Sequence, residues 1–549
     1  MRLEELKKEI KVHPDGGWIF YYYITQGYKE GEEKGLSNAQ IRAFGNYNIF
    51  ARTKPHIYKN DLIVGSMRSA WGEASKEERE EALDLYLHKY KGYPAADHFA
   101  PYFDDILRGI PYVFEKIERS KEKNKNFPEK LDFLEAVRIA LDGFTVRIKN
   151  YIAHAESLIG QDGYDEKTLK KIIENCTALL NGAPETFEQA LQLIWFIHTA
   201  FMLENRYAMA LGRIDKYLYP FYKKDVENGI LTKEYAVELL ENIFIKIHER
   251  FSFIHQDDVV NIAIGGVDEN GKCSVNELTY CVLEAVGNVH VPGPNLSARI
   301  SSDCPDEFID ECLKVLKTGL GYPALMNDDV NIPALLKYGY DVKDARNYSM
   351  VGCIENFITG MQPAWLDGRF DTPRFFEYVF KNYKNGLYEI KTMDDFIKRF
   401  EEEIAKGIKQ YVDAYNNRFD YEHLEKYTQP FLSLFCYDCI DRGLDICMGG
   451  AKYPAVYGAG VMGIGTVTDS LAAVEKVVFV DKEATLEELA DATAANFEGY
   501  EELHRKLLAA PKYGNNDDFV DKWAVWFVDY ITSVFNRYKL PDGGHVYTL

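Results

Sequence analysis

The sequence predicts an α/β fold with a largely parallel sheet, and two observations support this prediction. Apolar residues recur with helical spacing through the first half of the chain, as in 77–90 and 187–209. The second half alternates short apolar runs typical of strands with longer runs typical of helices. The strand-like runs are 257–266, 294–301 and 455–465, and the helical runs are 275–289, 305–321 and 470–479. Such alternation favours parallel strands joined by helices.

The 549 residues read as one compact unit. Hydrophobic residues make up 46% of the chain, which is ample for a buried core. No internal repeat, low-complexity tract or Pro/Ser linker interrupts the sequence. Its last residues, "LPDGGHVYTL", predict a turn that enters a strand.

Charge and cysteine content narrow the class of protein. A formal net charge of -22 argues against nucleic acid and anionic membrane surfaces as partners. The longest apolar run, 190–203, is too short to span a bilayer, and the N-terminus lacks the apolar core of a secretory signal. Nine scattered cysteines without an export signal indicate reduced thiols in a cytoplasmic protein.

Three short motifs match the spacing of known binding signatures in a context that favours ordinary structure. In "GVDENGKC" (266–273), Cys273 stands where a phosphate-binding loop needs Ser or Thr, and "DENG" favours a tight turn. "GAGVMG" (458–463) has dinucleotide-site spacing, but Pro454 interrupts the segment before it. "CYDC" (436–439) has no second ligand pair for zinc. A dinucleotide-binding oxidoreductase is kept as an alternative function.

The stretch "SMVGCIENF" (349–357) carries the main candidate chemistry. Residues two apart in an extended segment or loop tip project to one side, so Cys353 and Glu355 are expected to share space. Gly352 leaves room for a close approach. A neighbouring carboxylate raises the pKa of a thiol, which disfavours a thiolate nucleophile. A neutral thiol suits hydrogen-atom chemistry, in which a thiyl radical takes a hydrogen and the carboxylate moves a proton. The alternative is a small buried cysteine.

Together with other segments, "GCIE" (352–355) resembles the cysteine loop of the glycyl radical enzymes, the pyruvate formate-lyase superfamily. Matching segments in family order include "YKNDLIVG" (58–65), "ENRYAMALGRIDKYLYPFY" (204–222), "DARNYSMVGCIE" (344–355) and "CIDRGLDICMGGAKYP" (439–454). The resemblance implies a ten-stranded α/β barrel of two half-barrels, surrounded by helices. It implies one pyruvate formate-lyase-like domain over 1–549, with a helical part over about 1–250 and a barrel with the cysteine loop over about 251–549.

The resemblance also implies catalytic roles and a reaction type. Cys353 is expected to become the thiyl radical and Glu355 to move the accompanying proton. Pyruvate formate-lyase itself has two adjacent cysteines in this loop. Gly352 stands at the position of the first of them, which disfavours acyl transfer to coenzyme A. A glutamate two residues after the cysteine resembles the eliminating members, so we predict a dehydratase or C–N or C–S lyase acting on a small molecule. Arylacetate decarboxylation and addition to fumarate remain alternatives, as does a non-catalytic scaffold.

Candidate substrate-binding residues follow from the same resemblance. They are Tyr90, His98, Arg206, Tyr207, Asp367, Arg369 and Phe370. Aromatic rings among them would suit a ring or a quaternary amine, and Arg206 or Arg369 would suit a carboxylate or sulfonate. Tyr207 and Ala208 stand where diol dehydratases carry a His-Ser pair, a departure that disfavours a simple diol substrate.

The segment that stores the radical in this family is the main departure. Family members continue past the turn at Gly543 and Gly544 into a loop like R-V-x-G-Y, and this sequence contains no such loop. We therefore expect a split enzyme in which a small glycine-radical subunit completes the barrel. A separate radical-SAM activating enzyme with an iron–sulfur cluster would install the radical on that partner. The chain itself is expected to bind no cofactor or metal, to form an oligomer and to come from an anaerobic source.

Overall fold

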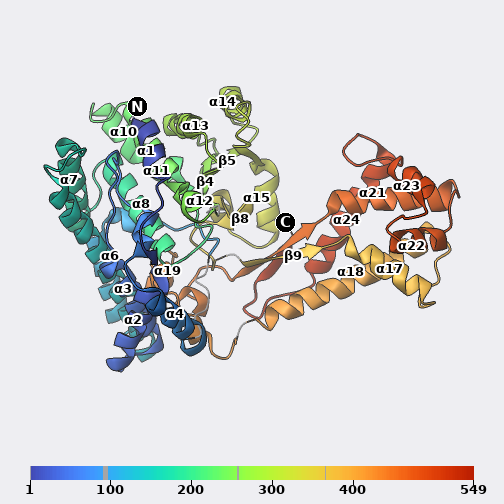
Figure 1. Cartoon of the computed structure of the whole chain (residues 1–549), viewed down its shortest axis with the longest axis horizontal. Helices are drawn as coiled ribbons and strands as arrows, with labels where there is room; N and C mark the ends of the chain where they lie inside the picture. The colour runs from blue at the N-terminus through green and yellow to red at the C-terminus, as the bar shows by residue number, and fades with distance from the viewer. Residues whose placement is uncertain (1, 91–96, 256–258, 365, 419, 549) are drawn as a thin grey trace. The chain divides into compact units, whose positions relative to one another are not determined.

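The computed structural model describes residues 2–90, 97–255, 259–364, 366–418 and 420–548. The chain divides into two compact units (Figure 1). The first unit comprises Met1–Trp365 and His423–Pro454, and the second comprises Leu366–Glu422 and Ala455–Leu549. The assignment of 1–549 to one family domain stays a prediction.

Helices make up most of the first unit, as the apolar spacing predicts. Helix α8 illustrates what stabilises them. The Thr186 side chain caps its start by accepting a hydrogen bond from the Gln189 N–H, and every residue of the helix is buried. The helices are α1 Arg2–Glu9, α2 Phe20–Glu33, α3 Asn38–Arg52, α4 Lys76–Asp84, α5 Ile110–Lys123, α6 Pro128–Leu158, α7 Glu166–Asn181, α8 Phe187–Leu203, α9 Ile214–Tyr217, α10 Tyr219–Glu227, α11 Lys233–Ile247, α12 Glu249–Ile254, α13 Glu277–Val289, α14 Asp306–Leu316, α15 Asp328–Lys337, α16 Val342–Arg346, α19 Pro430–Ser433 and α20 Cys439–Arg442.

A parallel sheet of four strands forms the centre of the first unit. Its strands are β3 Gly212–Arg213, β4 Asn261–Gly265, β5 Asn295–Ile300 and β6 Ala324–Asn327, in that spatial order. β4 is buried along its whole length, as expected of a parallel strand covered on both faces. Helices α13 and α14 connect β4 to β5 and β5 to β6, which confirms the predicted alternation. Residues 257 and 258 of the predicted strand lie outside the described residues.

Two antiparallel pairs complete the strands of this unit. β1 Gly17–Trp18 pairs with β2 Trp71–Gly72, and β7 Tyr348–Val351 pairs with β8 Glu355–Ile358. The second of these pairs carries the predicted cysteine loop.

The second unit contains a parallel sheet of three strands. β10 Val456–Met462 lies between β9 Leu366–Asp371 and β11 His545–Thr548. β11 confirms the strand predicted after "LPDGG". The helices are α17 Arg374–Lys384, α18 Met393–Asn416, α21 Ile464–Val474, α22 Leu486–Ala494, α23 Glu501–Leu508 and α24 Asp518–Phe535. Their apolar side chains form one core with those of the sheet.

The short motifs adopt ordinary structure. "GVDENGKC" is a tight turn, because Val267 pairs with Cys273 and the Asp268 N–H donates to the Lys272 carbonyl at 2.7 Å. Gly458 and Gly460 of "GAGVMG" lie inside the central strand β10, whereas a dinucleotide fingerprint needs its glycines at the turn into a helix. Cys436 and Cys439 are buried.

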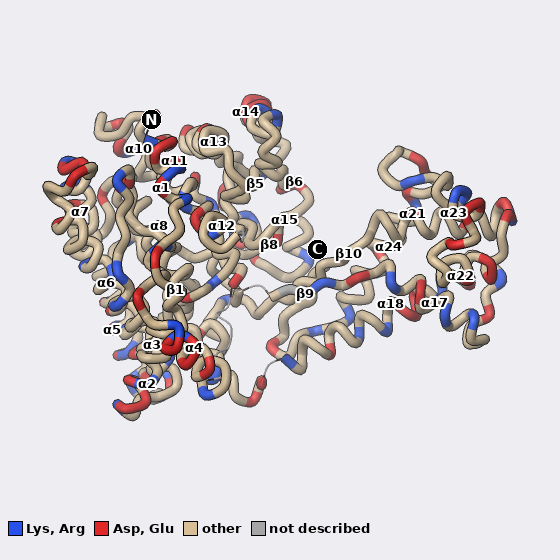
Figure 2. The backbone as a smooth tube through the Cα atoms, viewed as in Figure 1, with Lys and Arg blue, Asp and Glu red and all other residues tan. Residues whose placement is uncertain are grey.

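The fold is α/β, as predicted. The described strands form sheets of four, three and two strands, so the ten-stranded barrel stays a prediction. Basic and acidic residues are interspersed along the described helices of each unit (Figure 2). Among the described helices, none combines the length and the apolar content that crossing a bilayer requires.

Candidate active site

The β7–β8 hairpin presents Cys353 at its tip. Val351 pairs with Glu355, so Gly352, Cys353 and Ile354 form the turn between the strands. Gly352 has a φ of +56°, a backbone conformation that favours glycine. Cys353 is exposed, whereas the other eight cysteines are buried or partly buried. The stretch is thus a hairpin turn, which corresponds to the loop tip, one of the two geometries predicted from the sequence.

Glu355 is held within the same turn. Its side chain is buried, and its Oε2 accepts a hydrogen bond from the Ile354 N–H at 2.9 Å. A methyl group added to Gly352 would lie 2.6 Å from this oxygen, so the carboxylate lies directly against the glycine backbone. The thiol and the carboxylate therefore come from one turn of the chain, as the sequence predicts for a loop tip.

His98 approaches this turn from the helical part of the first unit. The same added methyl would lie 2.4 Å from His98 Cδ2, so the imidazole and the Glu355 carboxylate both lie against Gly352. His98 Nδ1 lies 2.9 Å from Asp97 Oδ1. The backbone N–H of His98 donates to the backbone carbonyl of Tyr207 at 3.2 Å. The rings of the two residues meet edge to face, with their centroids 5.9 Å apart. The structure thus brings His98 to the cysteine turn, and Tyr207 contacts His98.

Arg206 and Tyr90 make their described contacts elsewhere. Arg206 is fully buried, and its guanidinium bonds to both Glu204 carboxylate oxygens at 3.0 and 3.1 Å and to Gln429 at 2.9 Å. A substrate carboxylate would have to displace Glu204 to reach it. The Tyr90 hydroxyl donates to Glu32 at 3.0 Å, and its ring contacts Tyr28. None of these described contacts links either residue to the cysteine turn.

The three candidates from the second unit lie on β9. The backbones of Asp367 and Arg369 pair with Gly458 and Gly460 of β10. Arg369 is exposed. Phe370 is buried in the aromatic core of that unit, with Phe375, Tyr411 and Phe535 at ring distances of 5.3 to 5.5 Å. Packing explains Phe370 fully, and the predicted substrate contacts of all three residues stay predictions.

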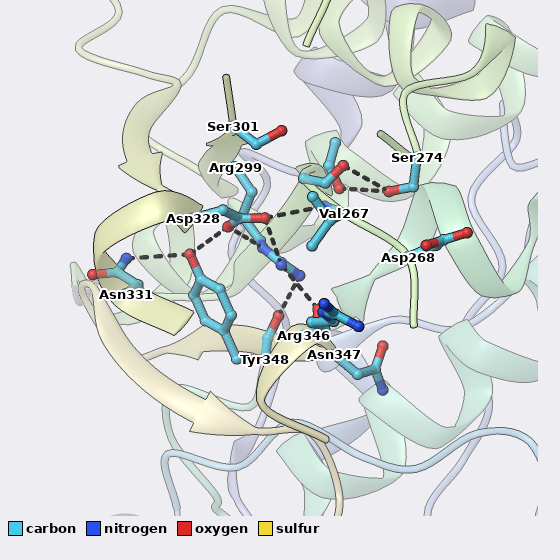
Figure 3. A network of polar contacts seen from close by, with 12 residues as sticks. Val267, Asp268, Ser274, Arg299, Ser301, Asp328, Asn331, Arg346, Asn347 and Tyr348 are labelled. Atoms are coloured by element: carbon cyan, nitrogen blue, oxygen red, sulfur yellow. Dashed lines mark hydrogen bonds and ion pairs between the residues drawn. The ribbon is translucent and has the colours of Figure 1, made fainter. Parts of the chain in front are cut away.

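Sequence reasoning missed several residues that hold this hairpin. Asp97 had one available signal, an acidic residue next to a candidate histidine. Asn261 and Asn295 donate to backbone carbonyls of the tip from strands far away in the sequence. At the base of the hairpin, Arg299 and Asp328 form a buried ion pair beside Tyr348 (Figure 3). Burial raises the pKa of Tyr348, so its hydroxyl stays protonated and donates to Asp328.

Comparison with known proteins gives the family context of this hairpin. Residues 66–549 match the family described as Pyruvate formate lyase-like. The chain is 31% identical over 434 residues to trans-4-hydroxy-L-proline dehydratase of Clostridioides difficile, covering 74% of this chain and 54% of that protein. The chain therefore spans about half the length of that relative.

Two solved structures share the fold over the whole chain. The glycerol-bound B12-independent glycerol dehydratase from Clostridium butyricum superposes with a TM-score of 0.89 and 26% identity, covering 100% of this chain and 80% of that one. A glycyl radical enzyme from Archaeoglobus fulgidus superposes with a TM-score of 0.87 and 26% identity, covering 100% and 81%.

Proposed function

Because this chain belongs to the pyruvate formate lyase-like family of glycyl radical enzymes, we propose that it carries the thiyl cysteine of a radical lyase or dehydratase. The enzyme would eliminate water, an amine or sulfite from a small molecule. The observation that carries this proposal is the turn at Gly352, where an exposed thiol, a buried carboxylate and an imidazole come together.

Cys353 performs the hydrogen-atom transfer in this proposal. A glycyl radical would take the hydrogen atom of the Cys353 S–H group, which would leave a thiyl radical on Cys353 and an ordinary glycine at the radical source. The thiyl sulfur then takes one hydrogen atom from a substrate carbon, which forms an S–H bond and leaves a carbon radical. After the leaving group departs from the neighbouring carbon, the thiol returns a hydrogen atom to the product radical. The exposed tip position fits this role, because the sulfur must meet both the substrate and the radical source.

Glu355 and His98 handle the two protons of the elimination. Glu355, held by the Ile354 N–H, accepts the proton from the substrate hydroxyl or amine on the radical carbon. His98, whose Nδ1 lies against Asp97, donates a proton to the departing group. The substrate loses one proton to Glu355, and the leaving group gains one proton from His98. The total charge of substrate and leaving group therefore does not change.

The radical that reaches Cys353 must come from a glycine residue. We propose that the radical glycine is supplied by a small partner subunit. A radical-SAM activating enzyme would install it there. We also propose that each parallel sheet is part of a half-barrel of the ten-stranded type. Organic radical signals from this chain incubated with activase, with and without the partner, test the split arrangement.

Two variants test the catalytic assignment in the complete, anaerobically activated enzyme. We expect Cys353→Ser to abolish turnover, since an alcohol cannot replace the thiyl radical. We expect Glu355→Gln to lose about 100-fold or more in kcat, because an amide cannot accept the proton. Cys273→Ser, at a partly buried thiol of the same unit, is the matched control and should keep wild-type activity. A Cys353→Ser enzyme that kept most of its activity would overturn the assignment.

A substrate panel tests the reaction type. Trans-4-hydroxy-L-proline, glycerol, isethionate and 4-hydroxyphenylacetate cover dehydration, sulfite elimination and decarboxylation. We expect turnover with an eliminating substrate, detected as a carbonyl or imine product by mass spectrometry. Release of carbon dioxide from 4-hydroxyphenylacetate, with no elimination product from the others, would favour the decarboxylase alternative.

A further inference from the structure

Two asparagines begin adjacent strands beneath the cysteine turn. Asn261 is the first residue of β4 and Asn295 the first residue of β5, and the parallel register places them directly opposite each other. Both side chains are buried. Register partners in a parallel sheet point to the same face, so the two amides lie side by side.

Each amide donates to one carbonyl of the turn. Asn261 Nδ2 donates to the Cys353 carbonyl at 3.1 Å, and Asn295 Nδ2 donates to the Gly352 carbonyl over a longer 3.5 Å. These carbonyls belong to the two peptide groups that flank the Cys353 Cα. A peptide group is planar, so holding both planes sets φ and ψ of Cys353 and thereby the direction of its Cα–Cβ bond, from which the sulfur extends.

Hydroxyl groups hold the oxygen end of both amides. Asn261 Oδ1 accepts from Ser297 Oγ at 3.3 Å, and Asn295 Oδ1 accepts from the Tyr322 hydroxyl at 2.8 Å. The turn carbonyls can only accept, so the NH₂ group of each amide is the end that faces the turn, and each hydroxyl donates to the amide oxygen at the other end.

The Asn261 bond also reaches the proposed proton acceptor. The peptide group between Cys353 and Ile354 is held at its carbonyl by Asn261 and at its N–H by the Glu355 carboxylate. One planar group therefore transmits the position of Asn261 to both Cys353 and Glu355.

The base of the hairpin is held separately. Arg299 donates to the carbonyls of Tyr348 and Arg346, each at 2.9 Å, while Asp328 binds its guanidinium (Figure 3). Arg213 donates to the same Arg346 carbonyl at 3.3 Å. Since the arginines secure the base of the hairpin, loss of an asparagine contact should loosen the tip without detaching the hairpin.

We infer that Asn261 and Asn295 are positioning residues that orient the Cys353 sulfur and the Glu355 carboxylate through the two peptide groups flanking Cys353. This inference rests on the proposed function. Neither amide needs to touch the substrate for this role.

The decisive variant is Asn261→Asp, which keeps the shape of the side chain and replaces its donor with a carboxylate oxygen. Asn242→Asp is the matched control, because Asn242 is also buried and its Nδ2 donates to a backbone carbonyl, that of Asn60, at the same 3.1 Å. In peptides covering 351–355, we expect about tenfold faster hydrogen exchange in Asn261→Asp than in wild type or in Asn242→Asp. This readout needs no turnover, so it fails or succeeds independently of the proposed function.

In the activated enzyme, we expect Asn261→Asp to lower kcat about 100-fold with KM unchanged, since a misdirected sulfur affects hydrogen transfer more than binding. A protonated Asp can donate to the carbonyl, so the ratio of variant to wild-type kcat should recover as the pH falls. Tyr322→Phe, which frees the Asn295 amide to rotate, is the second variant if Asn261→Asp does not fold, and should lower kcat in the same way. Wild-type exchange and wild-type kcat in Asn261→Asp, or equal losses in Asn242→Asp, would overturn the inference.

Discussion

At the scale of single residues, Gly352 has two reasons to be glycine. Its φ of +56° disfavours any side chain. A methyl group would also lie 2.4 Å from His98 Cδ2 and 2.6 Å from Glu355 Oε2. Both neighbours are the ends of flexible side chains, which can move aside at little cost to the fold. The groups that would move are the ones proposed to transfer protons.

We therefore predict that Gly352→Ala folds but loses turnover. Gly229→Ala is the control, since Gly229 has a similar φ of +68° and no atom within 4 Å of its added methyl. Both variants should lose about 1–2 kcal/mol of stability from backbone strain, measured by urea unfolding. Only Gly352→Ala should lose kcat, by about 100-fold, because it displaces the acid and the base. Equal activity in the two variants would contradict this role for Gly352.

At the scale of elements, α12 begins with a buried carboxylate. Glu249 accepts hydrogen bonds from Ser66 Oγ at 3.0 Å and from the Met67 N–H at 2.7 Å. Burial raises its pKa from 4.5 to about 7, and Lys246 opposes this shift. The folded protein thus holds this proton more tightly than the unfolded chain. The stabilisation is fully present below the unfolded pKa and is lost as the pH rises through the folded value.

Glu249→Gln removes this titration, because glutamine stays neutral at every pH. Between about pH 4.5 and 7, the free energy of unfolding of the variant should rise relative to wild type, by an amount on the order of 3 kcal/mol. Urea unfolding over this range measures the difference. Glu77→Gln, at an exposed position of α4, should show no such trend. Parallel pH profiles for wild type and Glu249→Gln would contradict the raised pKa.

Local patterns sufficed to predict those elements that have a long or continuous apolar pattern. The run 275–289 gave a helix at Glu277–Val289, because apolar spacing and the Asn276 cap agree there. The β7–β8 hairpin was missed, since each strand has only four residues and too short a pattern to distinguish. The contact of Asn261 with Cys353 spans 92 positions of sequence, and no local rule connects them. Cys353 and Glu355 were found because neighbours in the sequence remain neighbours in a turn.

At the scale of the whole molecule, the described sheets account for seven parallel strands in two units, four in the first and three in the second. Family membership rests on a match over residues 66–549 and on superposition with the glycerol dehydratase over the whole chain. The central claim concerns the fate of one hydrogen atom, and it can be tested once the panel yields a substrate.

The most direct measurement uses that substrate with deuterium on the carbon next to the leaving group. In the activated enzyme, the Cys353 sulfur should take the deuterium and return it to the neighbouring carbon after elimination. We predict a product in which the label has left its original carbon and appears on the carbon that lost the leaving group, read by NMR. A product that retains all of its deuterium on the original carbon would contradict hydrogen-atom transfer by Cys353.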